Sequence, residues 1–209
     1  NVPKKLVLNL TYVWLLLFLH GDVWAIEPLA TPDFYDIEYP DDEPPQAGEV
    51  QLGKALFFDP LLSGNRSMSC ATCHNPSLGF GDGLKLSFGA NGRPLKRHTP
   101  HLYNLAWASS FFWDGRASTL EQQVIMPISN PDEMNLSINE LIIRLKKSTR
   151  YQQQFAAVYG AEGISKHTIR LGLASFVRSL VSRDTPFDRF LAGDNKALGQ
   201  KALRGLALI

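Results

Sequence analysis

Both cysteines of this 209-residue chain lie in one pentapeptide, Cys70-Ala71-Thr72-Cys73-His74. The C-x-x-C-H pattern is typical of the site at which a c-type haem is attached. In such a site the two thiolates add to the vinyl groups of the haem, and the histidine that follows approaches the iron as an axial ligand. The motif therefore predicts thioether bonds from Cys70 and Cys73 and an iron ligand at His74.

Three other uses of the cysteine pair stay open at this point. A redox-active dithiol usually opens a helix after a strand in a thioredoxin-like chain, and no such pattern precedes Cys70. A structural zinc site needs four ligands, and His98 and His101 are available to complete one. A disulfide across so short a loop would stabilise the fold little. Haem attachment is the use that we expect.

The N-terminal residues are typical of an export signal. Lys4 and Lys5 precede the apolar run Leu6–Leu19, and the small residue Ala25 marks a cleavage site. A retained membrane anchor is the alternative, but this predominantly apolar run of 14 residues is short for a span that needs about 20. We therefore predict a signal peptide over 1–25 and a periplasmic location.

A linker is predicted over 26–47, which holds five of the 13 prolines and seven acidic residues. Proline continues neither a helix nor a sheet ladder, so an extended course is expected. The formal charge of the whole chain is only +1. Without a basic excess, nucleic acid is not expected as a partner.

A compact domain begins at about residue 48 with a short amphipathic helix. Leu52, Leu56 and Phe57 lie on one face of this helix, which should stop at Asp59-Pro60. Residues 60–118 are rich in Gly, Ser, Asn and Pro and show little periodicity. So long a structureless stretch inside a compact domain suggests that a large bound cofactor holds it.

The second half of the chain is predicted to be helical. The helix that opens at Ser118 should end near Pro127. The helix over Tyr151–Tyr159 should end at Gly160. No two-residue alternation persists, so the predicted fold is an all-α domain with long loops. The predicted helix starts are Ser118, Ser137, Ser165, Thr185 and Asn195.

The chain resembles the bacterial di-haem cytochrome c peroxidases and the related MauG proteins. Over 48–209 the matching segments occur in the family order and with family-like spacing. The resemblance implies a cytochrome c-like N-terminal haem domain over 48–195 and the first helix of a second, similar domain over 196–209. Lys201–Leu208 resembles the lead-in to a second C-x-x-C-H motif, so the second haem is expected beyond Ile209 in a longer chain. The segments that carry the resemblance are Leu52–Pro60, Ser69–Pro76, Gly81–Gly83, Phe112–Ala117 and Pro127–Met134.

The resemblance also implies roles for individual residues. His74 is then the proximal ligand of a haem that reacts with peroxide, and Trp113 is the tryptophan between the two haems. Glu133 is expected to move a proton between the peroxide oxygens, and Gln123 to orient peroxide. Pro127 adds bulk without a ligating atom. Taken without the resemblance, Trp113 is better explained by core packing beside Phe111 and Phe112. Gln123 and Glu133 are then compatible with solvated helix and loop residues, and Pro127 with a helix stop.

Two positions depart from the family pattern. Many family peroxidases carry a distal histidine that blocks the resting haem, where this chain has Ala90. We therefore expect a five-coordinate haem, as in MauG-like proteins, unless His98 or His101 reaches the iron. The family's calcium site uses an asparagine that is His98 here, so calcium binding requires a backbone carbonyl or water in its place. Either Arg97 or Arg116 is expected to pair with the haem propionates.

The resemblance implies a periplasmic peroxidase that reduces hydrogen peroxide with electrons from a small donor, either a cytochrome c or a cupredoxin. A MauG-like alternative oxidises residues of a partner protein. A third possibility is an electron-transfer cytochrome with Met126 or Met134 as its second axial ligand. Family members are often dimers, so a homodimer is one expected assembly. Because peroxide reduction consumes two electrons, a chain with one haem is expected to be inactive or impaired alone.

Overall fold

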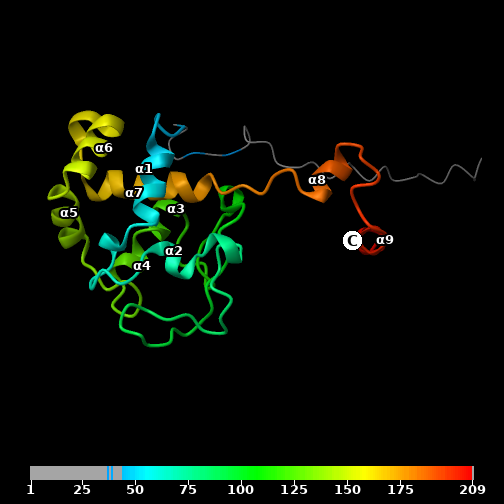
Figure 1. Cartoon of the computed structure of the whole chain (residues 1–209), viewed down its shortest axis with the longest axis horizontal. Coiled ribbons are helices and arrows are strands. Elements are labelled where there is room, and N and C mark those ends of the chain that lie inside the picture. The colour runs from blue at the N-terminus through cyan, green and yellow to red at the C-terminus, as the bar shows by residue number, and fades with distance from the viewer. Residues whose placement is uncertain (1–36, 38, 40–43, 209) are drawn as a thin grey trace, which may run out of the picture. The chain divides into compact units, whose positions relative to one another are not determined.

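The computed structural model describes residues 37, 39 and 44–208 (Figure 1). The predicted signal peptide over 1–25 lies outside the described residues, as does most of the predicted linker over 26–47. Among the helices of the described residues, none combines the length and the apolar character needed to cross a membrane.

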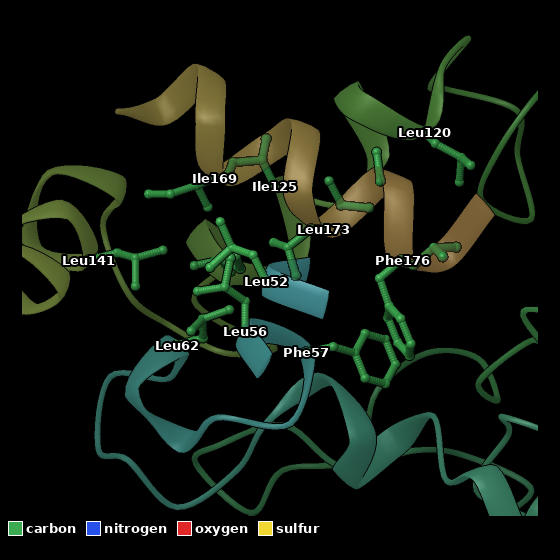
Figure 2. Close-up of a cluster of buried hydrophobic side chains, with 14 of the residues drawn as sticks. Leu52, Leu56, Phe57, Leu62, Leu120, Ile125, Leu141, Ile169, Leu173 and Phe176 are labelled. Carbon is green, nitrogen blue, oxygen red and sulfur yellow. The ribbon is translucent and has the colours of Figure 1, made fainter. Parts of the chain in front are cut away.

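Two helices that lie far apart in the sequence form the centre of the compact unit Asp33–Thr185. These helices, α1 (Glu49–Phe57) and α7 (Lys166–Arg178), pack closely against each other. A Cβ atom at Gly53 would overlap the backbone carbonyl of Gly172, so the close approach requires glycine there. The predicted apolar face of α1 is confirmed, because its side chains are buried against apolar side chains of α7 (Figure 2). The residues of this contact are Leu52, Leu56, Phe57, Ile169, Leu173 and Phe176.

Four further helices pack around this pair. The helix α3 (Leu120–Gln123) contacts α7 and is followed by α4 (Met126–Ser129). The helices α5 (Ile138–Lys146) and α6 (Thr149–Tyr159) lie side by side, and α6 also contacts α1. Burial of Leu120, Ile125 and Leu141 joins these helices to the core shown in Figure 2.

Several predicted helix ends are confirmed. The hydroxyl of Ser137 accepts a hydrogen bond from the Glu140 amide at 3.2 Å, and that of Ser165 accepts one from the Thr168 amide at 3.1 Å. These bonds satisfy backbone donors that the first helical turn leaves without a partner. Gly160 follows α6 with a φ of 55°, a value that favours glycine.

The prediction for the region before Pro127 was wrong in two details. Thr119, not Ser118, caps α3, because its hydroxyl accepts a hydrogen bond from the Gln122 amide at 3.2 Å. Pro127 lies in the first turn of α4 and does not end a helix. Proline is tolerated there because a first-turn amide has no partner within the helix.

The residues from Pro186 onward belong to a second unit. The helix α8 (Pro186–Leu191) begins at the predicted Thr185-Pro186 step. The helix α9 (Gln200–Leu206) follows Gly199, so the predicted start at Asn195 was wrong. The Asp194 carboxylate instead accepts a hydrogen bond from the Lys196 amide, which makes a turn at this point.

Long loops fill the stretch over 60–118, and the cysteine pair lies on a single helical turn within it, α2 (Cys70–Cys73). Within 44–208 the only β pairing consists of isolated bridges, so the predicted all-α class is confirmed. The loop stretch is closed at three points by such bridges: Asn75–Gly81, Phe88–Pro94 and Phe111–Ala117.

Candidate functional site

Both cysteines of α2 are free thiols. The Ser69 amide donates a hydrogen bond to the Thr72 hydroxyl at 2.9 Å, which holds the start of the turn. Burial raises the pKa of Cys70 to about 12. Burial is also the main cause that raises the pKa of Cys73, with the negative charge of Asp82 as a second cause. A redox-active dithiol needs a lowered thiol pKa, so these surroundings do not favour that alternative.

The zinc alternative has no support from the arrangement of side chains. Within the described ranges, no three His, Cys, Asp or Glu side chains are grouped so that they could hold a metal ion. His98 and His101 are both exposed.

His74 follows the cysteines and is held in one orientation. Its Nδ1 donates a hydrogen bond to the backbone carbonyl of Phe80 at 2.9 Å. A carbonyl can only accept, so Nδ1 carries the proton and Nε2 keeps its lone pair. Burial lowers the pKa of the imidazole, which favours the neutral form. A neutral histidine with one nitrogen bonded to a carbonyl is the usual arrangement of an iron-ligating imidazole.

A tight turn over Asn75–Gly81 brings the Phe80 carbonyl to His74. The Asn75 side chain accepts a hydrogen bond from the Ser77 amide at 2.9 Å, and its backbone carbonyl accepts one from the Phe80 amide at 2.8 Å. Phe80 has a φ of 58°, which is unfavourable for a bulky residue. The turn therefore holds a strained residue in the position that orients His74.

Glu133 is the half-buried carboxyl of the candidate site. Its Oε1 accepts a hydrogen bond from the side-chain amide of Asn130 at 2.9 Å. Burial raises its pKa, whereas the Asn130 hydrogen bond and the positive charge of Arg116 act in the opposite direction. The charge of Glu133 also contributes to the raised pKa of Cys73, so the two predicted residues belong to the same region.

The loop that carries Ala90 packs against the loop that carries Glu133. The Ala90 amide donates to the Glu133 carbonyl at 2.7 Å, and the Asn91 side chain donates to the Pro131 carbonyl at 3.2 Å. At Gly89, a Cβ atom would overlap the carbonyl of Asp132. Ala90 is therefore fixed next to the predicted acid–base residue.

Pro127 is hydrogen-bonded to the same loop, whereas Gln123 makes no hydrogen bond to it within 44–208. The Pro127 carbonyl accepts a hydrogen bond from the Met134 amide at 3.2 Å. Gln123 is the half-buried last residue of α3, and within 44–208 its side-chain amide has no hydrogen-bond partner. Of the two methionines considered as ligands, Met134 is buried in the apolar core and Met126 is partly exposed.

Trp113 lies on the surface, with 54% of the residue exposed. Its indole nitrogen donates to the His98 carbonyl at 3.1 Å, and its ring meets the His98 ring edge-on at 4.7 Å. The two side chains belong to an open cleft of about 480 Å³, whose other lining residues are Lys85, Leu86, Lys96 and Arg97. Trp113 is thus not a core residue.

Sequence reasoning missed two residues that support the site. Phe80 orients His74, and Asn130 binds Glu133. Asn130 follows α4 and its carboxamide also accepts from the Asp132 amide at 3.0 Å, which is the Asx-turn pattern that an Asn-Pro-Asp sequence favours. That pattern was a usable signal, whereas the left-handed φ of Phe80 had none.

The residues around α2 fit a covalently attached haem. The two thiols are free, and the imidazole Nε2 retains its lone pair. Among the described residues, most large apolar side chains that are exposed lie in the segments before and after α2 in the sequence. A porphyrin would provide them with an apolar partner. They are Phe58, Leu78, Leu84, Leu86, Phe88, Tyr103 and Trp113.

Comparisons with known proteins agree with this site. A family model described as di-haem cytochrome c peroxidase matches residues 47–196. The chain is 49% identical over 173 residues to the methylamine utilization protein MauG of Methylorubrum extorquens, covering 82% of this chain and 49% of the relative. It is 39% identical over 166 residues to the cytochrome c peroxidase Ccp of Escherichia coli, covering 79% and 36% of the two chains.

A solved structure has the same fold. A MauG-like protein associated with microbial copper homeostasis superposes with a TM-score of 0.77 at 31% identity. The match covers 88% of this chain and 54% of that one. The chain spans about half the length of the MauG relatives that it matches.

Proposed function

The chain belongs to the di-haem cytochrome c peroxidase family, and on that premise we propose that it forms the peroxide-reacting haem domain of a periplasmic di-haem c-type peroxidase. The family implies haem c as the cofactor. The orientation of His74 carries the proposal: its Nδ1 donates to the Phe80 carbonyl, and the residue directly follows a pair of cysteines that form no disulfide. The proposed reaction is the reduction of hydrogen peroxide to water.

Three residues would hold the haem in this chain. Cys70 and Cys73 would form the thioether bonds, and His74 would bind the iron. When bound, the haem would supply the redox chemistry that passes electrons from a donor to peroxide. Arg97 is a better partner for the propionates than Arg116, because the Arg116 guanidinium already pairs with Asp114 at 2.7 Å.

Glu133 is proposed as the acid–base residue of the reaction. Its raised pKa lets it accept a proton from one peroxide oxygen and return it to the leaving oxygen. The hydrogen bond from Asn130 fixes the carboxyl during this transfer. Glycine at position 89 lets the two loops approach this closely, because a Cβ atom there would overlap the carbonyl of Asp132.

The remaining catalytic residues have supporting roles. Gln123 has a side-chain amide without an internal partner, so it is available to orient peroxide by a hydrogen bond. Pro127, whose carbonyl binds the Met134 amide, would add bulk on the peroxide side of the haem without offering a ligating atom. Trp113 would relay electrons between this haem and a second one, since its exposed indole is oxidisable.

Ala90 favours an open coordination position in the resting state. A methyl group cannot bind iron, and Ala90 is held beside Glu133 by a backbone hydrogen bond. This arrangement also supports MauG-like oxidation of a partner protein as a second candidate function. The higher identity to a MauG protein than to the Escherichia coli peroxidase is a further point in its favour.

The test uses the full-length protein with its haems attached. We expect hydrogen peroxide to be consumed at the expense of a reduced small cytochrome c or cupredoxin, with two equivalents of the one-electron donor oxidised per peroxide. A protein that consumes peroxide only while a co-expressed partner gains a covalent oxidation would instead support the MauG-like function. A haem-loaded protein that reacts with peroxide in neither assay would refute both.

A further inference from the structure

Tyr103 lies at the surface end of a series of aromatic contacts that begins at His74. Tyr103 is 37% exposed, and its ring meets the ring of Phe80 edge-on, with a centroid distance of 5.4 Å and an interplanar angle of 87°. Such an edge-to-face contact is a favourable arrangement for two aromatic rings. The phenol therefore reaches water while its ring stays packed against a buried neighbour.

Phe80 connects this surface residue to His74 in two ways. Its backbone carbonyl accepts the hydrogen bond from His74 Nδ1 at 2.9 Å. Its ring lies 6.3 Å from the ring of Phe57, which in turn lies 6.4 Å from the imidazole. Both routes are short and packed, and Phe80 itself is only 7% exposed.

The other tyrosines among the residues that the structure describes lack this combination. Tyr151 is buried and donates its hydroxyl hydrogen to Asp59 at 2.7 Å. Tyr159 is also buried, and its ring packs against Phe155 rather than near His74. Tyr39 lies beneath the Arg178 guanidinium at 5.4 Å. Of the tyrosines in the described part of the chain, Tyr103 is thus the one that combines exposure with a ring contact to Phe80, whose carbonyl binds His74.

We propose that Tyr103 is a redox-active residue that gives up one electron through Phe80 and His74 when the haem-loaded protein meets peroxide without an electron donor. The proposal rests on the proposed function, because hydrogen peroxide acting at the haem is the oxidant. Tyr103 would protect the haem site by moving oxidising equivalents to the surface.

The step balances in electrons and protons. The phenol O–H bond of Tyr103 breaks, the electron passes toward the haem and the proton passes to bulk water, which leaves a neutral phenoxyl radical. Phenoxyl radicals from two molecules can then join by one carbon–carbon bond between their rings, to form dityrosine. In total, two tyrosines and one hydrogen peroxide give one dityrosine and two waters.

The test treats the haem-loaded full chain with stoichiometric hydrogen peroxide and no donor. We expect an organic radical in the electron paramagnetic resonance spectrum, with hyperfine structure that changes when the tyrosines are ring-deuterated. Peptide mass spectrometry should locate the dityrosine bond at Tyr103. The readouts are spectroscopic and covalent, so they do not depend on turnover.

Tyr103→Phe is the decisive variant, because it keeps the ring that packs on Phe80 and removes only the phenol. It should retain the Soret spectrum of the parent protein and lose both the tyrosyl signal and the dityrosine. Tyr39→Phe is the matched control and should keep both. Phe80→Leu should reduce the radical yield, since it removes the connecting ring and leaves the backbone carbonyl in place.

The outcomes separate this inference from the proposed function. If the haem-loaded protein does not consume peroxide at all, the proposed function fails, and this inference fails with it. If peroxide is consumed but Tyr103→Phe forms as much tyrosyl radical and dityrosine as the parent protein, only this inference is overturned.

Discussion

At the residue scale, Glu133 is the side chain whose surroundings are most clearly adapted to chemistry. Its carboxyl combines a raised pKa with one fixing hydrogen bond from Asn130. Removing a positioned acid–base group typically slows a reaction by about 10²- to 10⁴-fold. We therefore expect Glu133→Gln to lower the rate constant of the peroxide reaction by about that factor, measured by stopped-flow absorbance of the haem.

The control is Asp132→Asn, which makes the same charge change on the exposed neighbouring residue. It should leave the rate constant at its optimum pH nearly unchanged. If Glu133→Gln reacts as fast as the parent protein, the role assigned to Glu133 is wrong.

The pH dependence of the same rate constant provides a second prediction. The carboxylate form of Glu133 accepts the proton, so the rate should rise with pH through a midpoint above the ordinary range for glutamate. Asp132 raises this pKa and Arg116 lowers it. Asp132→Asn should therefore move the midpoint to lower pH, and Arg116→Gln should move it to higher pH.

The substitution that slows the reaction, Glu133→Gln, should not lower the free energy of unfolding. Because burial raises the folded-state pKa of Glu133, ionisation destabilises the fold, with the full penalty above that pKa. The penalty declines as the pH falls through it and is gone below the ordinary pKa of glutamate. Glu133→Gln should thus be at least as stable as the parent protein at neutral pH, in denaturant unfolding. For the pH dependence of the rate constant, a shift of the midpoint in the same direction in Asp132→Asn and Arg116→Gln would contradict its assignment to Glu133.

Several site residues were predictable from sequence because they lie in short, ordered motifs. Cys70, Cys73 and His74 are consecutive positions of one pattern, and that pattern is local. The residues that support them are not predictable in this way. Phe80 acts through a backbone carbonyl that only its left-handed φ places beside His74, and sequence gives no sign of such a strained position.

At the element scale, the contact between α1 and α7 depends on the glycine at position 53. Overpacking a closely packed core typically costs about 1–3 kcal/mol, and at Gly53 the obstructing atom is a backbone carbonyl that cannot swing aside. Gly53→Ala should therefore lower the free energy of unfolding by about 3 kcal/mol or more, measured by denaturant titration.

Gly205→Ala is the matched control. This glycine lies inside α9, and a Cβ atom there meets nothing within 4 Å. The substitution should be neutral or stabilise by up to about 1 kcal/mol, because alanine is the better helix former. Equal effects of the two substitutions would contradict the packing argument.

Arg144 ties α5 to the loop that leads into the cysteine motif. Its guanidinium donates to the backbone carbonyls of Leu61, Ser63 and Gly64 at 3.3, 2.8 and 3.0 Å. Lysine keeps the charge but cannot reproduce this fork of donors. Arg144→Lys should lower the free energy of unfolding by about 2 kcal/mol, since hydrogen bonds from charged donors contribute about 1.5–3 kcal/mol each.

Arg150→Lys provides the comparison for that substitution. The Arg150 side chain is 57% exposed and approaches Asp59 only to 3.9 Å. Such surface pairs contribute less than about 1 kcal/mol. A loss of stability in Arg150→Lys as large as that in Arg144→Lys would show that the three carbonyl contacts are unimportant.

The accuracy of prediction differed between elements for a physical reason. Ser137 and Ser165 precede long apolar faces, so capping and burial favour the same helix start. The short elements α3 and α4 have little periodicity, and α3 is held by its packing against α7. Sequence alone therefore did not separate Thr119 from Ser118 as the cap, nor place Pro127 in the first turn of α4. The residue at the N-cap of α9, Gly199, has no side chain that could cap the helix, so sequence offered no local signal for its start.

At the scale of the whole molecule, most of the large apolar side chains that stay exposed among the described residues lie between positions 58 and 113 of the sequence, the part that contains the cysteine turn. The loops over 60–118 were predicted to depend on a bound cofactor, and Leu84, Leu86 and Phe88 are all partly or largely exposed there. The all-α class and the family were predictable from sequence and are confirmed. The predicted domain boundaries at residues 48 and 195 stay predictions, as do the periplasmic location and the homodimer.

Covalent attachment of one haem to this chain is the central claim, and the mass of the purified protein tests it most directly. The chain should be produced by export in cells that mature c-type cytochromes, and it should then show a Soret band and the mass increment of one haem. Peptide mapping should place that increment on the segment with Cys70 and Cys73, and it should be absent from the Cys70→Ala, Cys73→Ala double variant. A colourless protein with the mass of the polypeptide alone would contradict the account.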